Sequence, residues 1–269
     1  MTTYLDRIIA SHRAHAAGDT RDLADLEASA RSAAPCRGFE AALRAGDSLA
    51  VIAEVKRASP SKGPLKADLD PATMAKAYEH GGAAALSVLT DIEFFEGSEA
   101  DLRAARGAAG TPVLRKDFTV STLDVLDARV MGADAVLLIV AALSDGELAE
   151  FLGLARSFGM DALVEVHDEA EASRAMEAGA TLVGVNQRDL LTFEVDTGRA
   201  VRVAQSLGSD VCRVAESGIS GRDDVARLAE AGFDAVLVGE SLVCSPDPAV
   251  AVAQLAGVPR TAGAGGSAR

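Results

Sequence analysis

Two oppositely charged side chains, Glu54 and Lys56, stand at the end of an otherwise apolar run at residues 49–56. In an extended chain successive side chains alternate between faces, so Glu54 and Lys56 share one face with Ile52. A strand that is apolar on both faces is buried on both, and buried charges cost several kcal/mol unless they are paired or used. The pair is therefore either a structural ion pair or part of a reactive site.

Polar side chains that can donate, accept or orient protons end several further apolar runs. They are Lys116, Glu165, Asn186 with Arg188 just beyond it, and Glu216. In a barrel of parallel strands the carboxyl ends meet at one mouth, where catalytic groups gather, whereas the inner layers are normally aliphatic. A single such end is equally consistent with a surface charge, but their recurrence on separate strands predicts a polar pocket.

Glycine-containing turns follow the last two apolar runs, at residues 216–220 and 238–241, and both are expected to begin helices. Gly218 and Gly239 permit close backbone approach, and N–H groups at helix starts suit a phosphate. Ordinary strand-to-helix turns are the alternative. The loop at residues 59–63 brings a hydroxyl and a lysine that could complete a phosphate site, or it could be only an exposed loop.

The elements that must position these groups repeat one pattern, in which a short aliphatic run precedes a helix-like stretch. The eight strand-like runs are residues 49–56, 83–89, 112–116, 133–140, 162–166, 181–186, 210–216 and 234–239. The eight helix-like stretches are residues 71–80, 98–106, 121–131, 144–158, 168–178, 197–207, 221–231 and 247–255. Eight such units predict an α/β fold, a (β/α)₈ TIM barrel. A doubly wound open sheet is the alternative, disfavoured because no Gly-x-Gly-x-x-Gly turn follows the first strand.

The predicted barrel carries an N-terminal helical extension at residues 4–45. We expect one domain over residues 1–256, with a disordered Gly-, Ala- and Ser-rich tail at residues 257–269. The net charge of −14 argues against a general nucleic-acid or anionic-membrane surface. The N-terminus lacks a signal-like pattern and no apolar run could span a bilayer, so we expect a cytoplasmic protein. We also expect a monomer.

The cysteines and histidines suggest no metal site. The three cysteines lack Cys-x-x-Cys spacing and are expected to be buried apolar residues. His12, His15 and His80 are expected at the surface. His167 shares a face with Glu165, yet no further group is evidently placed to complete a ligand set. We therefore predict no metal and no cofactor.

Six segments in this order resemble the indole-3-glycerol phosphate synthase family. They are residues 52–63 (IAEVKRASPSKG), 86–91 (LSVLTD, followed by Phe94, Phe95 and Gly97), 114–118 (LRKDF), 163–167 (LVEVH), 184–190 (GVNQRDL) and 216–219 (ESGI). The resemblance runs from the leader helices through the eighth strand. It implies a (β/α)₈ barrel with an N-terminal extension. The implied reaction closes the pyrrole ring of 1-(2-carboxyphenylamino)-1-deoxyribulose 5-phosphate, with loss of CO₂ and water, to give indole-3-glycerol phosphate in tryptophan biosynthesis.

The resemblance also implies roles for the polar strand ends. Lys116 would be the acid for ring closure, and Lys56 would assist there or protonate the leaving hydroxyl. Glu165 would be the base, Asn186 would orient the intermediate, and Glu54 and Glu216 would hold the lysines and substrate hydroxyls. The expected binding residues are Ser59, Arg188, Ser217, Gly218, Gly239, Glu240 and Phe118. Arg188 and Lys56 could meet the benzoate carboxylate, while Ser59, Gly218, Gly239 and the backbone at Glu240 would bind the phosphate.

Two positions depart from the family pattern. Gln187 stands where asparagine is usual, and Glu240 stands where some members have serine. A glutamate side chain directed at a phosphate would repel it, whereas a contribution from the backbone N–H alone would be unaffected.

Two other functions remain open at this point. Phosphoribosylanthranilate isomerase is a similar phosphate-binding barrel, but such sites usually carry a Cys or Asp pair at strands one and five, where this chain has Glu54, Lys56 and Glu165. A non-catalytic sugar-phosphate sensor would keep the glycine turns and lose the lysines, yet Lys56 and Lys116 are both present.

Overall fold

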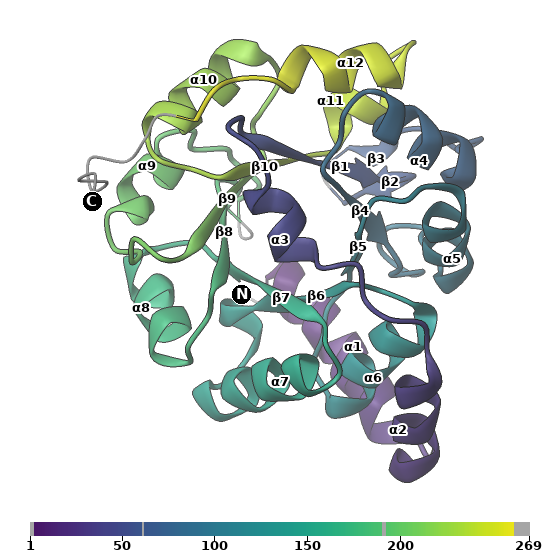
Figure 1. Cartoon of the computed structure of the whole chain (residues 1–269). Coiled ribbons are helices and arrows are strands. Elements are labelled where there is room, and N and C mark those ends of the chain that lie inside the picture. The colour runs from purple at the N-terminus through teal and green to yellow at the C-terminus, as the bar shows by residue number, and fades with distance from the viewer. Residues whose placement is uncertain (1–2, 61, 190–191, 261–269) are drawn as a thin grey trace.

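Eight parallel strands close into a barrel in the computed structural model, which describes residues 3–60, 62–189 and 192–260 (Figure 1). The barrel strands are β1 (Ala50–Val55), β4 (Ala85–Leu89), β5 (Val113–Lys116), β6 (Ala135–Ile139), β7 (Asp161–Val166), β8 (Leu182–Asn186), β9 (Cys212–Glu216) and β10 (Ala235–Val238). The barrel closes because β1 pairs with both β4 and β10. The predicted (β/α)₈ fold is confirmed and the open sheet is excluded.

A helix follows each barrel strand, as the alternating sequence pattern predicts. These helices are α4 (Pro71–His80), α5 (Glu99–Ala108), α6 (Thr122–Met131), α7 (Asp145–Ser157), α8 (Glu169–Glu177), α9 (Arg199–Ala204), α10 (Arg222–Glu230) and α12 (Pro248–Leu255). Two short elements are added, the 3₁₀ helix η1 (Val140–Ala142) and α11 (Glu240–Val243). Ser98, Ser121 and Ser144 begin their helices because each hydroxyl accepts a hydrogen bond from a free N–H of the first turn.

The alternation predicted for the first strand is confirmed by the packing of β1. Its odd-numbered side chains lie in the layer between strands and helices, whereas Ile52 lies in the barrel interior. Phe39 and Leu43 of α3 (Phe39–Arg44) are fully buried against that interior. In Figure 1, α3 lies at the centre of the ring of strands, so this short helix closes the amino-terminal end of the barrel.

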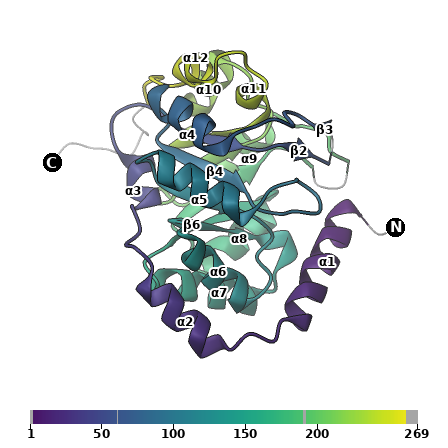
Figure 2. The same cartoon turned by 90° about the vertical axis from the view of Figure 1, so that its right-hand side faces the viewer.

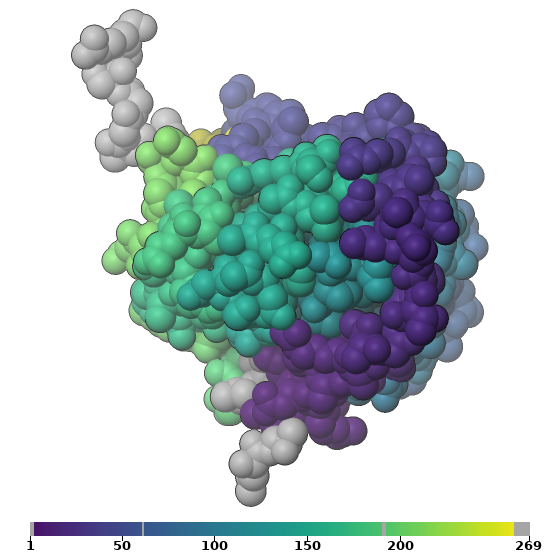
Figure 3. Space-filling model, turned by 90° about the horizontal axis from the view of Figure 1, so that it is seen from below, coloured from purple at the N-terminus to yellow at the C-terminus, as the bar shows by residue number. Residues whose placement is uncertain are grey.

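Of the remaining N-terminal helices, α2 (Leu23–Ser32) packs on the outside of the barrel against α6, whereas α1 (Tyr4–Gly18) lies at one of its ends. Leu26 and Ala30 of α2 form an apolar cluster with Leu126 and Phe158. In Figure 3 the N-terminal segment forms a continuous purple band along the lower part and the right-hand side of the molecule. In Figure 2, α1 lies at the end of the barrel opposite to α3. The extension therefore contacts both ends of the barrel.

The packed part of the chain extends further beyond α12 than the sequence suggested. Val258 is buried and its carbonyl accepts a hydrogen bond from the Leu49 N–H at 2.8 Å, while the Arg260 N–H donates to the Asp47 carbonyl at 2.8 Å. The prediction of disorder is therefore wrong for residues 257–260, because their backbone pairs with the segment that enters β1. The rest of the predicted tail, residues 261–269, lies outside the described residues.

No helix in the described part of the chain is both long enough and apolar enough to cross a membrane. Cys36, Cys212 and Cys244 are free thiols. Cys212 is buried as predicted, whereas Cys244 is exposed and Cys36 is partly buried.

Candidate active site

One cavity of about 470 Å³ lies at the carboxyl ends of the strands. Every residue that the sequence analysis named as catalytic or binding lines it: Glu54, Lys56, Ser59, Lys116, Phe118, Glu165, Asn186, Arg188, Glu216, Ser217, Gly218, Gly239 and Glu240. The predicted polar pocket therefore exists, while the individual roles of these residues stay predictions.

Lys116, at the end of β5, lies among three glutamates. Its Nζ is 2.9 Å from Glu165 Oε2 and 3.5 Å from Glu216 Oε2. Burial opposes the charge of Lys116, but Glu165, Glu216 and Glu54 outweigh it and raise its pKa. Burial likewise opposes ionisation of Glu165, yet Lys116 and then His167 lower its pKa. The resting site therefore contains an ammonium group in direct contact with a carboxylate.

Glu216 differs from its neighbours. Burial is the largest influence and raises its pKa, and the nearby carboxylates Glu165 and Glu54 act in the same direction, whereas Lys116 opposes them. Its Oε1 atom is buried and has no hydrogen-bond partner among the described residues. Gly184 of β8 provides the space, because a Cβ at that position would collide with Glu216 Oε1. A glycine inside a strand thus allows a long acidic side chain to enter the barrel.

Asn186 connects Glu165 to the loop after β8. Its Nδ2 donates to Glu165 Oε1 at 3.0 Å, and its Oδ1 accepts from the Arg188 N–H at 3.0 Å. The Arg188 guanidinium donates to the Phe193 carbonyl at 3.0 Å. Asn186 therefore fixes the orientation of Glu165 and the start of the arginine-bearing loop at once.

The Glu54 and Lys56 pair forms the wall next to β10. Lys56 Nζ lies 2.5 Å from Glu54 Oε1, and Ser87 Oγ donates to Glu54 Oε2 at 3.4 Å. A Cβ on Gly239 would collide with the Glu54 carboxylate and would lie 3.1 Å from Lys56 Nζ. Gly239 therefore serves to make room for this ion pair, a role that the sequence analysis did not assign to it.

The two glycine turns differ from each other. Both turns lead into helices as predicted, because α11 begins directly after Gly239 and α10 begins at Arg222, after the N-cap Gly221 that follows the turn at 216–220. In the turn at 216–220, however, Ser217 and Gly218 both adopt left-handed backbone conformations, with φ of 66° and 70°, whereas Gly239 has a φ of −121°. A serine rarely adopts that conformation, and such residues gather at functional sites. Gln187 supports the turn, because its Nε2 donates to the Ser217 carbonyl at 2.8 Å.

The side chain of Glu240 is paired. Its Oε1 lies 3.3 Å from Nζ of Lys62, which belongs to the loop after β1. That loop contains the short antiparallel pair β2 (Ala58–Ser59) and β3 (Gly63–Pro64). Because Lys62 neutralises the carboxylate, the repulsion of a phosphate that the sequence suggested is reduced.

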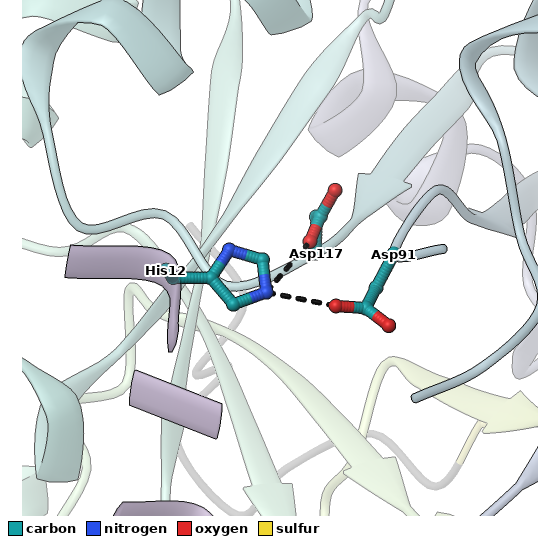
Figure 4. A group of neighbouring side chains, drawn as sticks. All are labelled: His12, Asp91 and Asp117. Atoms are coloured by element: carbon teal, nitrogen blue, oxygen red, sulfur yellow. Dashed lines mark hydrogen bonds and ion pairs between the residues drawn. The ribbon is translucent and has the colours of Figure 1, made fainter. Parts of the chain in front are cut away.

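The N-terminal helix contributes residues that the sequence analysis missed. Tyr4, Leu5 and Ile8 of α1 line the cavity. His12, expected at the surface, instead points from α1 toward two aspartates, with Nε2 at 2.8 Å from Asp91 Oδ2 and 3.9 Å from Asp117 Oδ1 (Figure 4). The position of His12 one turn after Ile8, on the apolar face of the helix, was the available signal for this placement.

The His12, Asp91 and Asp117 group has donor atoms close enough to hold an ion, but its carboxylates already have partners. Asp117 Oδ2 accepts from Arg115 at 2.9 Å and from Thr90. Asp91 Oδ1 accepts from two backbone N–H groups of the following loop. The arrangement therefore acts as a charged hydrogen-bond network that attaches α1 to the loops after β4 and β5.

Residues 5–255 match the model of the family described as indole-3-glycerol phosphate synthase. The chain belongs to the indole-3-glycerol phosphate synthase family. Relatives of that name include those of Mycobacteroides abscessus, 52% identical, and Mycobacterium avium, 51% identical, each over 94% of this chain and 93% of the relative. The chain is therefore a carboxy-lyase of tryptophan biosynthesis.

Solved structures of more distant proteins share the barrel. Thiamine phosphate pyrophosphorylase from Pyrococcus furiosus superimposes with a TM-score of 0.58 at 16% identity, covering 77% of this chain and 93% of that one. N-acetylmannosamine-6-phosphate 2-epimerase from Clostridium perfringens gives a TM-score of 0.57 at 13% identity, covering 71% and 86%. At these identities the likeness concerns the fold alone.

Proposed function

We propose that the cavity closes the pyrrole ring of 1-(2-carboxyphenylamino)-1-deoxyribulose 5-phosphate, expelling CO₂ and water. The observation that carries this assignment is the contact between Lys116 and Glu165 in a cavity bordered by the two glycine turns. Ring closure needs an acid at the ribulose carbonyl oxygen, and dehydration needs an acid at the departing hydroxyl and a base for the lost ring proton.

Lys116 is the proposed acid for ring closure. When it gives its proton to the carbonyl oxygen, the aromatic carbon bonds to the carbonyl carbon, and the carboxylate then leaves as CO₂. Its strong pairing with Glu165 makes it a weak acid at rest, so substrate groups that draw the glutamate away would strengthen it. Lys56, held by Glu54, assists that step or protonates the leaving hydroxyl.

Glu165 is the proposed base for the second half of the reaction. It accepts the ring proton as the hydroxyl leaves as water, and the electron pair of the broken C–H bond forms the indole double bond. Asn186 orients this carboxylate through a 3.0 Å hydrogen bond. Glu216 holds the other side of Lys116 and a substrate hydroxyl.

The phosphate is proposed to bind between the loops after β9 and β10, near Ser217, Gly218, Gly239 and the N–H of Glu240, with Ser59 contributing its hydroxyl. Loops at these positions, with a short extra helix such as α11, form the phosphate site of many (β/α)₈ barrels. At the other side of the cavity Arg188 meets the benzoate carboxylate, and the Phe118 ring contacts the aromatic part of the substrate.

We also propose that the protein works as a cytoplasmic monomer without metal or cofactor. The free thiols suit a reducing compartment. The acid and base of the proposed mechanism are both side chains of this one chain.

Incubation of the chain with the carboxyphenylamino-deoxyribulose phosphate, followed by indole fluorescence, tests the proposal. We expect multiple turnovers without added metal, and competition by inorganic phosphate. A well-folded chain that yields no indole fluorescence would refute the assignment. Isomerisation of phosphoribosylanthranilate by the same preparation would support the competing function.

A further inference from the structure

His167 approaches the proposed base from outside the cavity. It lies at the end of β7, two residues after Glu165, and its Nε2 is 3.4 Å from Glu165 Oε1. Among the described residues the cavity lining includes Glu165 but not His167. Substrate bound in the cavity therefore contacts one side of the Glu165 carboxylate while His167 lies on another.

Glu171, near the start of α8, fixes the histidine ring. Glu171 Oε2 accepts a hydrogen bond from the His167 backbone N–H at 2.8 Å and lies 3.0 Å from Nδ1. The carboxylate is itself positioned because the Glu171 N–H donates to Asp168 Oδ1 at 2.8 Å. A carboxylate accepts only, so Nδ1 carries a proton and Nε2 faces Glu165. Nε2 is buried and has no hydrogen-bond partner within the described ranges.

The charges around this pair favour an imidazolium. The charged groups that face His167 are Glu165 from β7 and Glu171 from α8. Burial opposes the charge of the ring, but both carboxylates outweigh it and raise the pKa of His167 to about 10. The other charged groups around Glu165 are Lys116 from β5, Glu216 from β9 and, further away, Glu54 from β1. Lys116 and His167 are thus the two cations next to the base.

These two cations behave differently during the proposed reaction. Lys116 gives up its proton in ring closure and becomes neutral, at which point Glu165 would lose its principal counter-charge in a buried site. A buried carboxylate without a cation tends to take up a proton, and it could then no longer act as a base. His167 does not face the substrate, so its charge is not used in that step.

We propose that His167 is a positioning residue that keeps Glu165 ionised as the base after Lys116 has given up its proton. This inference rests on the proposed role of Glu165. Glu171 supports this role by holding the imidazole ring of His167 in place. No change in bonding to His167 itself is required.

The test compares His167→Asn and Glu171→Gln with His15→Asn, a control that makes the same chemical change at an exposed histidine of α1. The acid limb of the kcat profile reports ionisation of the base in the substrate complex. We expect this limb to move upward by about one pH unit or more in His167→Asn, as loss of a neighbouring cation predicts. We expect a smaller shift in Glu171→Gln, none in the control, and a KM within about twofold of the parent in all three.

A direct titration of the His167 ring by NMR in the parent protein provides a readout independent of turnover. We expect the ring to stay protonated through pH 8 and its pKa to fall in Glu171→Gln. A ring that titrates near pH 6.5, or a kcat that falls equally at all pH values in His167→Asn, would overturn the inference. If His167→Asn does not fold, the NMR titration of the His167 ring in the parent protein and the kcat profile of Glu171→Gln test the inference without it.

The same experiments separate this inference from the proposed function. A parent chain without turnover, or a Glu165→Gln variant with normal turnover, removes the proposed base and this inference with it. If the parent chain turns over, Glu165→Gln is inactive and the acid limb of the kcat profile does not move in His167→Asn, only the proposed role of His167 is refuted.

Discussion

Gly184→Ala is the substitution that most directly tests how the barrel accommodates the buried side chain of Glu216. The added methyl group would collide with Glu216 Oε1 and lie 3.2 Å from Leu163 Cδ1. Overpacking of this kind typically costs about 1–3 kcal/mol in the free energy of unfolding. The glutamate must move by roughly an ångström to relieve the collision, and displacements of that size lower turnover by about 10²-fold.

Gly153→Ala is the matched control, because Gly153 is exposed in the interior of α7 and a Cβ there meets nothing within 4 Å. Alanine in a helix is about 0.5–1 kcal/mol more favourable than glycine, so this variant should gain stability at unchanged kcat. Urea unfolding and steady-state turnover measure both quantities.

A second comparison isolates the collision. If Gly184→Ala acts by moving Glu216, then adding it to Glu216→Ala should cost little further activity, because the displaced group is already gone. Equal losses in the presence and absence of the glutamate would refute this explanation, and so would a Gly184→Ala protein with normal turnover and stability.

Three further substitutions test other parts of the site. Lys116→Ala should lower kcat by about two orders of magnitude or more with an unchanged circular dichroism spectrum, as loss of a general acid predicts. In spite of burial, the hydrogen bond with Asp91 raises the pKa of His12, so its stabilising charge is present below pH 6.5 and lost as the pH rises through the folded value. His12→Asn should therefore lower the free energy of unfolding more at pH 5.5 than at pH 9 in urea titrations, and an equal loss at both would contradict this ionic attachment of α1. Lys62→Met leaves Glu240 unpaired near the proposed phosphate site, so KM should rise, and more at low than at high ionic strength. A KM independent of salt would show that the Glu240 carboxylate does not affect phosphate binding.

The sequence predicted the barrel because its strands and helices are set by local patterns. Short aliphatic runs recur in each unit, serine or aspartate caps begin six of the eight helices that follow the barrel strands, and eight units close a barrel. The carboxyl ends of parallel strands meet at one edge, so the proximity of charged residues such as Lys116 and Glu165 could be predicted from the topology alone. The alternation that placed Glu54 inside the barrel rests on the same geometry.

The contacts that sequence reasoning missed are those made across elements. The ring of His12 reaches the loops after β4 and β5 only because α1 folds back over the mouth, and nothing local to residue 12 fixes that path. The space that Gly184 leaves for Glu216 depends on the neighbouring strand. The pairing of His167 with Glu171 depends on the turn between β7 and α8, which brings the side chain of Glu171 back to the histidine ring.

Lys116 and Glu165 are proposed to serve successive steps of the reaction, and one measurement tests this division of roles most directly. Glu165→Gln is mixed in excess with substrate labelled at the carboxyl carbon, and labelled CO₂ and indole fluorescence are followed in the same single turnover. The parent protein should release both in equal amounts. Glu165→Gln should release CO₂, because the acid for ring closure remains, while indole forms at least about 10²-fold more slowly. Indole formation at the parent rate, or retained indole synthesis in Lys116→Ala measured in the same way, would contradict the assignment of acid and base.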